Sequence, residues 1–129
     1  MNYTDPFVKV AYDLVIEGEE LANTVLPDSV EEYVVLMFAK NFQRTDIGAN
    51  PVAIQMLEAC QHRGTEHYQP IADECLLIHS YPLNRRRWPT ETYYLEMGVT
   101  AYGLANIEIM ESNFEPASRV LRRVFKNFG

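Results

Sequence analysis

The chain has 129 residues, of which 47% are hydrophobic and 22% are charged. This length suits one domain with a continuous core, and the composition argues against intrinsic disorder. Two cysteines, Cys60 and Cys75, are too few for a disulfide scaffold, and the first residues lack the basic and apolar segments of a signal peptide. We therefore expect a cytoplasmic protein with reduced thiols. The longest apolar run, seven residues from Tyr33 to Ala39, is too short to span a membrane.

The net charge of −7 is distributed unevenly along the chain. Residues 1–64 contain ten acids and four bases, and residues 65–112 contain seven acids and three bases. Residues 113–129 reverse this balance, because Glu115 is followed by three arginines and one lysine. An acidic chain repels phosphate backbones at long range, which disfavours nucleic acid as a partner.

The first predicted helix begins with Asp5 as N-cap and Pro6 as its first helical residue. Apolar residues then recur at steps of three and four, which predicts one buried face. The members of this face are Phe7, Val10, Ala11, Leu14, Leu21, Ala22 and Val25.

The second predicted helix follows a break at residues 26–28, where Ser29 and Glu32 have the spacing of a capping box. Its run from Tyr33 to Ala39 is apolar on every side. This composition predicts a helix at the centre of the fold, and a buried strand is the alternative for so short a run.

The third predicted helix is short, with Asn50 as its cap and Pro51 as its first residue, and it stops near Gly64. Its expected inward residues are Ile54, Leu57 and Cys60. Thr65 is the predicted cap of the fourth helix. The apolar face of the fourth helix is predicted to consist of Tyr68, Ile71, Ala72, Cys75 and Leu76.

The fifth predicted helix extends from about Thr90 to Glu111, and a break at Ser112–Asn113 precedes the last helix. The inward residues of the fifth helix are predicted to be Tyr94, Met97, Ala101, Leu104 and Ala105, with Gly98 and Ala101 allowing close approach of a neighbour. The face of the last helix is predicted to be Ala117, Val120, Leu121, Val124 and Phe128. Because no segment alternates with period two, the predicted fold is all-α: one domain over residues 1–129, an antiparallel bundle of five to six helices.

Cys60, His62, Cys75 and His79 are the most suggestive group for chemistry. Two thiolates and two imidazoles would suit tetrahedral zinc, and Cys75 and His79 can share one helix face. The alternative is two small thiols and two histidines at helix ends, because Cys-x-His is not a common zinc spacing. We predict no metal or cofactor and keep these four residues as the candidate ligands. A di-iron site is disfavoured, since no Glu-x-x-His pair occurs.

A nucleophilic pair of Cys75 and His79, oriented by Asp73 or Glu74, is a second chemical reading. The apolar residues that follow Cys75 favour a core cysteine instead. The sequence also lacks a Gly-rich phosphate loop, a Gly-x-Ser-x-Gly elbow and a His-Glu-x-x-His stretch. These observations favour a protein that is not an enzyme.

The stretch Arg85-Arg86-Arg87-Trp88 is unusual in an acidic chain. Three guanidiniums beside an indole would bind a carboxylate, a phosphate or an acidic partner. The alternative is a solvated loop paired with the protein's own acids, while Trp88 fills the end of the bundle. Tyr94, soon after this stretch, is a further candidate contact.

The last predicted helix carries its basic residues, Arg119, Arg122, Arg123 and Lys126, opposite its apolar face. This is the ordinary amphipathic pattern. The sharper interpretation is a helix that docks on an acidic partner or on a second copy of this acidic chain, with Arg119 and Arg123 as contacts.

Two resemblances accompany these patterns. The segment Asn-Phe-Glu-Pro-Ala-Ser-Arg-Val-Leu at 113–121 resembles the start of the second helix of a tetratricopeptide repeat, and Gly98 with Tyr102 echoes the first. Residues 73–78, 85–87 and 93–102 are similar to a set of small uncharacterised proteobacterial helical proteins. The second resemblance implies a bacterial cytoplasmic helical protein and nothing about mechanism.

Taken as sequence evidence, these patterns favour a non-catalytic helical interaction module: a small adaptor, regulator or inhibitor that binds another protein or itself as a homodimer. The alternative is a bundle that binds a small molecule or a metal near Cys75, His79, Arg85 and Tyr94.

Overall fold

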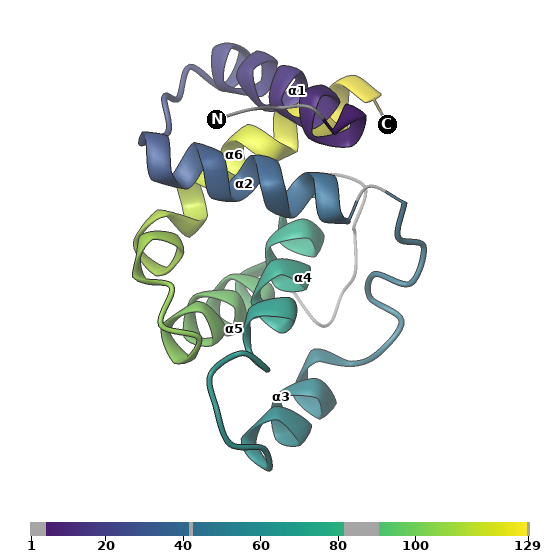
Figure 1. Cartoon of the computed structure of the whole chain (residues 1–129), viewed down its shortest axis with the longest axis vertical. Coiled ribbons are helices and arrows are strands. Elements are labelled where there is room, and N and C mark those ends of the chain that lie inside the picture. The colour runs from purple at the N-terminus through teal and green to yellow at the C-terminus, as the bar shows by residue number, and fades with distance from the viewer. Residues whose placement is uncertain (1–4, 42, 82–90, 129) are drawn as a thin grey trace.

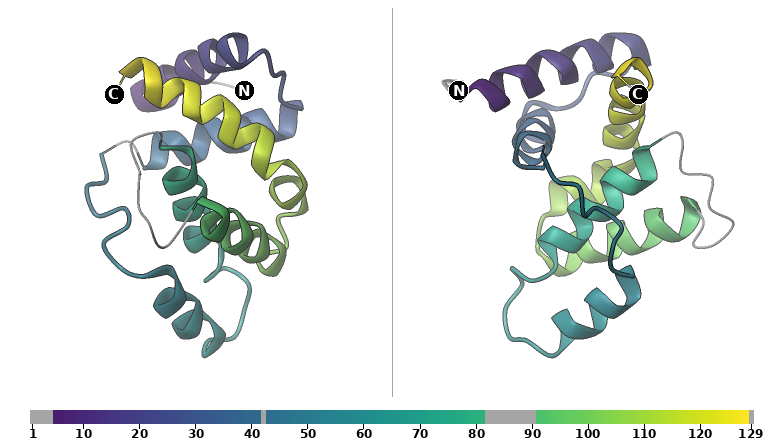
Figure 2. Two further views of the ribbon diagram at one scale, coloured as in Figure 1. Left: turned by 180° about the vertical axis from the view of Figure 1, so that it is seen from behind. Right: turned by 90° about the vertical axis from the view of Figure 1, so that its right-hand side faces the viewer.

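A computed structural model describes residues 5–41, 43–81 and 91–128. Over these ranges the chain forms six helices and no strand, which confirms the all-α prediction (Figure 1). The helices are α1 (Pro6–Ala22), α2 (Asp28–Lys40), α3 (Val52–Cys60), α4 (Gln69–Ser80), α5 (Glu91–Leu104) and α6 (Glu108–Phe128). Figures 1 and 2 show α1, α2 and the C-terminal part of α6 at one end of the molecule and α3 at the other. No helix in the described ranges has the length and apolar content that crossing a bilayer requires.

Helix α1 begins as predicted, but a different face is buried. The Asp5 side chain accepts a hydrogen bond of 2.8 Å from the Phe7 N–H, and Pro6 is the first helical residue. The buried residues are Ala11, Val15, Gly18 and Glu19, whereas Phe7, Val10, Leu21 and Val25 are 44%, 45%, 45% and 89% exposed. The predicted face is therefore wrong for these four residues and confirmed for Ala11, because α1 packs on α6 through its smallest residues. A Cβ at Gly18 would lie 2.8 Å from the Val120 carbonyl oxygen.

The predicted caps of the next three helices are also wrong. Pro27, Pro51 and Tyr68 precede α2, α3 and α4, and none of the three helices has a side-chain cap. Each proline holds an extended backbone just before the first helical turn, and its carbonyl accepts the first helical hydrogen bonds. Ser29, Asn50 and Thr65 consequently have no capping role.

Helix α4, and not α2, is the most buried helix. Every residue from Ile71 to Ile78 is buried, and α4 contacts α3, α5 and α6. Leu36 of α2 is 42% exposed, so the prediction of a central helix at Tyr33–Ala39 is wrong. Apolar content alone does not place a helix centrally, because the number of neighbouring helices decides how many of its faces are covered.

The turn between the last two helices lies at Ala105–Ile107 and not at the predicted break. Asn106 adopts a left-handed conformation (φ 61°), and the Ile107 N–H donates to the Tyr102 carbonyl at 3.0 Å. This is the usual way for a helix to end on an asparagine. The predicted break at Ser112–Asn113 is instead a kink inside α6, where Asn113 has φ −123° and ψ 21°. Pro116 explains the kink, since a proline ring crowds the carbonyl four residues earlier.

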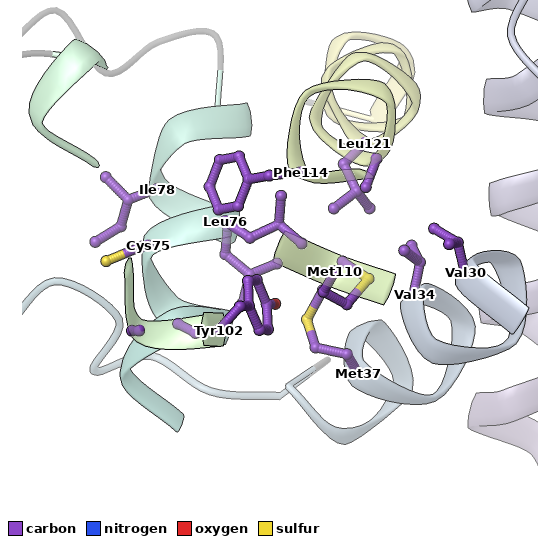
Figure 3. Close-up of a cluster of buried hydrophobic side chains, with 14 of the residues drawn as sticks. Val30, Val34, Met37, Cys75, Leu76, Ile78, Tyr102, Met110, Phe114 and Leu121 are labelled. Atoms are coloured by element: carbon purple, nitrogen blue, oxygen red, sulfur yellow. The ribbon is translucent and has the colours of Figure 1, made fainter. Parts of the chain in front are cut away.

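The core is built on α4, α5 and α6, with α2 closing one side (Figure 3). Its largest fully buried side chains are Tyr102, Phe114, Leu26, Leu76, Met110 and Leu121. The predicted faces of α4 and α6 are confirmed, apart from Tyr68, which is only partly buried, and the Phe128 side chain, which lies outside the described part. Gly98 permits the predicted close approach, because a Cβ there would collide with the Phe114 ring.

Several other predicted inward residues face solvent. Ile54 and Leu57 of α3 are 50% and 63% exposed, while Val52 and Ala59 are buried. Leu104, at the end of α5, is 43% exposed. Among the described residues, α3 packs mainly against α4. Only one narrow face of α3 is therefore covered.

Candidate functional site

The structure does not bring the four candidate zinc ligands together. Cys60 is exposed on α3 and accepts a hydrogen bond from the Tyr68 hydroxyl at 3.5 Å, while the His62 ring lies 4.8 Å from that of His67. Cys75 lies in the core and His79 at the end of α4. Among the described residues, no three histidines, cysteines or acids are grouped in a way that could hold a metal.

Cys75 is also poorly suited to be a nucleophile. Its side chain is fully buried, and burial raises the pKa of the thiol to about 12. A thiol with so high a pKa is almost entirely protonated at neutral pH, and the thiolate is the reactive form. The geometry therefore favours the interpretation that Cys75 is a packed residue of the core.

Asp73 and Glu74, the acids proposed to orient that pair, make their hydrogen bonds elsewhere. Asp73 Oδ1 accepts from the hydroxyls of Tyr33 at 2.6 Å and Tyr102 at 2.7 Å. Burial raises the pKa of Asp73, and these two hydrogen bonds oppose the rise. Burial also raises the pKa of both tyrosines. This cluster ties α2, α4 and α5 together in the interior.

Glu74 fixes the loop that leads into α3. Its Oε1 accepts from the Gly48 N–H at 2.6 Å, and its Oε2 accepts from Gln55 Nε2 at 2.9 Å. The Arg44 guanidinium lies 4.0 Å from Oε1. A carboxylate that is 4% exposed and held in this way is a structural group.

A chain of polar side chains extends from the last turn of α4 to α6. His79 Nδ1 lies 2.6 Å from Ser118 Oγ, and Ser118 Oγ lies 2.9 Å from Ser80 Oγ. Ser80 Oγ donates to the Leu76 carbonyl at 2.6 Å. The edge of the His79 ring also meets the Phe114 ring, with centroids 5.5 Å apart.

This chain borders an open pocket of about 330 Å³ between α4, α5 and α6. The pocket is lined by His79, Thr92, Leu95, Glu115, Ser118, Arg119 and Arg122. Arg122 Nη2 donates to the His79 carbonyl at 3.0 Å, which holds that guanidinium against the end of α4. The pocket thus combines two predicted basic residues of the last helix with His79.

Glu19 is a buried acid that the sequence patterns did not single out. Its Oε2 accepts from the Leu26 N–H at 3.1 Å, but its buried Oε1 has no hydrogen-bond partner among the described residues. Burial raises the pKa of Glu19 to about 7, with a further contribution from the nearby carboxyl of Glu31. Within residues 5–41, 43–81 and 91–128, no cation forms an ion pair with it.

The predicted binding residues lie in different environments. Arg85, Arg86, Arg87 and Trp88 lie outside the described residues. Arg119 and Arg123 are exposed on α6, as expected for contacts. Tyr94 is 4% exposed and belongs to the core, so little of its side chain is accessible to a partner.

Two features of these sites were missed by sequence reasoning. Ser118 lies 39 residues from His79, and no local pattern signals a contact over that distance. The second is that several apolar residues of α1 are exposed although they were predicted to face inward, and no local pattern separates them from the buried Ala11.

No protein-family model, curated protein or solved structure matches the chain. The function proposed below therefore rests on the sequence and the geometry alone.

Proposed function

We propose that this chain is a non-catalytic helical interaction module that associates with a second copy of itself through α1. The observation that carries the proposal is a stripe of apolar residues on this helix whose side chains are partly exposed. Val10 and Leu21 are each 45% exposed, Phe7 is 44% exposed, and Leu14 lies partly buried between them. These four residues are called the α1 stripe.

The spacing of the α1 stripe suits pairing with another helix. Phe7, Leu14 and Leu21 are seven residues apart, and Val10 occupies the intermediate position. Apolar residues that repeat every seven residues keep facing a partner helix along their whole length. Helix α1 also lies at the edge of the fold (Figure 2).

The symmetry of the stripe favours an antiparallel pair centred on Leu14. In that arrangement Phe7 of one copy meets Leu21 of the other, and a two-fold axis passes near Leu14. Such pairing also brings Lys9 of one copy near Glu17 and Glu20 of the other. Opposite charges on the flanks of a helix pair fix its orientation.

The basic end of α6 adds complementary charge beside α1. Asn127 Nδ2 donates to Glu17 Oε1 at 3.2 Å, so the last turn of α6 lies next to the acidic flank of the stripe. Arg123 and Lys126 are exposed in this part of α6. In a pair of copies they would face the acids Asp13, Glu17 and Glu20, which supports basic-on-acidic self-association.

The non-catalytic part of the proposal is supported by how the reactive groups are used. Cys75 is a buried thiol, and Asp73 and Glu74 accept hydrogen bonds that hold the fold together. The acids and the thiol that enzymes commonly use for proton transfer and nucleophilic attack are thus committed to packing.

Sedimentation velocity of the purified chain over about 10 µM to 1 mM tests the proposal. One helix pair covers less than the roughly 1,200–2,000 Å² of a stable interface, so we expect a dissociation constant in the range of about 10–100 µM. The double variant Val10→Glu/Leu21→Glu should be monomeric, because it places four carboxylates in the contact.

Ile54→Glu/Leu57→Glu is the matched control, since it changes two exposed apolar residues of α3 by the same chemistry. It should dimerise like the wild-type chain. A wild-type chain that stays monomeric at 1 mM would overturn the proposal. Loss of the dimer in the α3 control alone would assign the contact to α3 and not to α1.

A further inference from the structure

We propose that the pocket between α4, α5 and α6 binds the phosphate group of a small phosphomonoester. The pocket is called the His79 pocket, and its residues are those given above. The inference is independent of the α1 stripe, which lies on another helix.

The order of the hydrogen bonds at the pocket wall follows from proton counting. Each serine hydroxyl has one proton to donate, and a carbonyl can only accept. Because Ser80 gives its proton to the Leu76 carbonyl, Ser118 must donate to Ser80. Ser118 then accepts from His79, whose Nδ1 therefore carries a proton.

This order makes the wall a site for binding rather than for nucleophilic attack. A serine nucleophile needs a base that accepts its proton, whereas here the imidazole donates to the serine. The same Nδ1–H bond persists when His79 is a cation, so the wall tolerates a positive imidazole beside an anion. Ser118 is 2% exposed, which keeps this arrangement away from competing water.

The charges around the pocket favour an anion, although the whole chain is acidic. Among the described residues that line the pocket, Arg119 and Arg122 contribute two guanidiniums and Glu115 contributes one carboxylate. Within the described part of the chain, Arg119 and Glu115 do not form an ion pair, even though one helical turn separates them. Arg119 is thus able to turn toward a ligand.

The first turn of α5 borders the same pocket. It begins at Glu91, and Thr92 in its first turn lines the pocket. The first turn of a helix presents unpaired N–H groups and a partial positive charge. The two arginines line the same pocket as Thr92, and guanidinium forks match phosphate oxygens.

The size and lining of the pocket indicate a small ester. A volume of about 330 Å³ is at the lower end of small-molecule sites. Leu95 supplies an apolar wall on α5, which suits the few carbon atoms of such an ester. A nucleic acid would place many phosphates against the acidic remainder of the chain and is disfavoured.

Isothermal titration at constant ionic strength tests the proposal with glycerol 3-phosphate and inorganic phosphate, and with acetate and glycerol as comparison ligands. We expect both phosphates to bind with millimolar or tighter dissociation constants and the ester to bind more tightly. Amide shifts of Thr92 and Ser118 in nuclear magnetic resonance spectra should report the binding. Val10→Glu/Leu21→Glu should bind the phosphates like the wild-type chain.

The variant Arg119→Gln should weaken phosphate binding by about fivefold or more, since it removes a charge-assisted bidentate contact. Arg123→Gln is the matched control, because Arg123 is exposed on the same helix but does not line the pocket. Equal losses in the two variants would indicate general attraction to a basic helix and overturn the site. Binding of acetate as tightly as phosphate would overturn the ligand class, and no binding of any phosphate would overturn the proposal.

Discussion

Helices α1 and α4 are both rich in apolar side chains, but the fold covers them differently. In α4 every residue from Ile71 to Ile78 is buried, whereas α1 leaves Val10 and Leu21 nearly half exposed. The apolar residues of α4 are explained by the packing of a single chain. Those of α1 are covered only in part by the described residues, which is why we propose that a second copy packs on this helix.

The buried acids of the two helices differ in the same way. Asp73 and Glu74 of α4 accept two hydrogen bonds each from the protein. Glu19 of α1 has one buried oxygen without a partner among the described residues, and the pKa of Glu19 is raised to about 7. The buried acids of α4 therefore have hydrogen bonds that compensate for their burial, while the buried acid of α1 lowers the stability of the folded chain.

Truncating one leucine in each helix gives the largest expected contrast. Leu76 is fully buried, so Leu76→Ala should lower the free energy of unfolding by about 2–5 kcal/mol. Leu21→Ala should cost about 1 kcal/mol or less in protein diluted below the expected dissociation constant, because Leu21 is nearly half exposed. Urea unfolding followed by circular dichroism measures both, and equal losses would show that α1 is as tightly packed as α4.

Removing Asp73, which accepts hydrogen bonds from Tyr33 and Tyr102, should have the next largest effect on the free energy of unfolding. Asp73→Ala leaves the buried hydroxyl of Tyr102 and the partly buried hydroxyl of Tyr33 without their acceptor, at a cost of about 2–4 kcal/mol. Asp13→Ala, at an exposed acid of α1, is the control and should change stability by about 0.5 kcal/mol or less. A loss below about 1 kcal/mol for Asp73→Ala would mean that the cluster contributes little.

Removing the charge of Glu19, the buried acid of α1, should increase the free energy of unfolding, whereas removing Asp73 should decrease it. Because the pKa of Glu19 is raised in the folded chain, its ionisation destabilises the fold, and the penalty develops as the pH rises from about 4.5 to about 7. Glu19→Gln should therefore stabilise the chain by about 1–3 kcal/mol at pH 8.

Most of this advantage should be lost as the pH falls to about 4.5, where the Glu19 carboxyl is protonated in the folded chain and about half protonated in the unfolded chain. Thermal unfolding of both proteins between pH 4.5 and pH 8 measures it. A difference that does not change with pH would contradict the raised pKa. Glu20→Gln, at the exposed neighbouring acid, should show no such dependence.

Much of the fold could be predicted because the strongest patterns are local. The Asp5–Pro6 start, the faces of α4 and α6, and the close approach at Gly98 each depend on residues within one or two turns. The face of α1 could not be predicted in this way, since apolar residues cover more than half of its circumference. Which part is buried is decided by the small residues Ala11 and Gly18, where α6 fits most closely.

The sites were harder to predict because they join distant segments. The contacts of Asp73 with Tyr33 and Tyr102 span 40 and 29 residues, and no periodicity within one helix reveals them. Sequence reasoning did select His79 and Arg119, which line the same pocket. It grouped His79 with cysteines, however, because spacing along the chain does not show which helix lies opposite.

Disulfide cross-linking at Leu14 offers the sharpest test of the α1 pairing. In an antiparallel pair centred on Leu14, the two copies of this residue face each other, within the roughly 7 Å Cα separation that a disulfide allows. The two copies of Val10 would be displaced by eight residues, or about 12 Å along the helix axis. The exposed Cys60 is replaced by serine in both proteins to remove its thiol. Under mild oxidation, Leu14→Cys/Cys60→Ser should form a covalent dimer, and Val10→Cys/Cys60→Ser should remain almost entirely monomeric. Equal cross-linking at both positions, or none at Leu14, would contradict the antiparallel contact through α1.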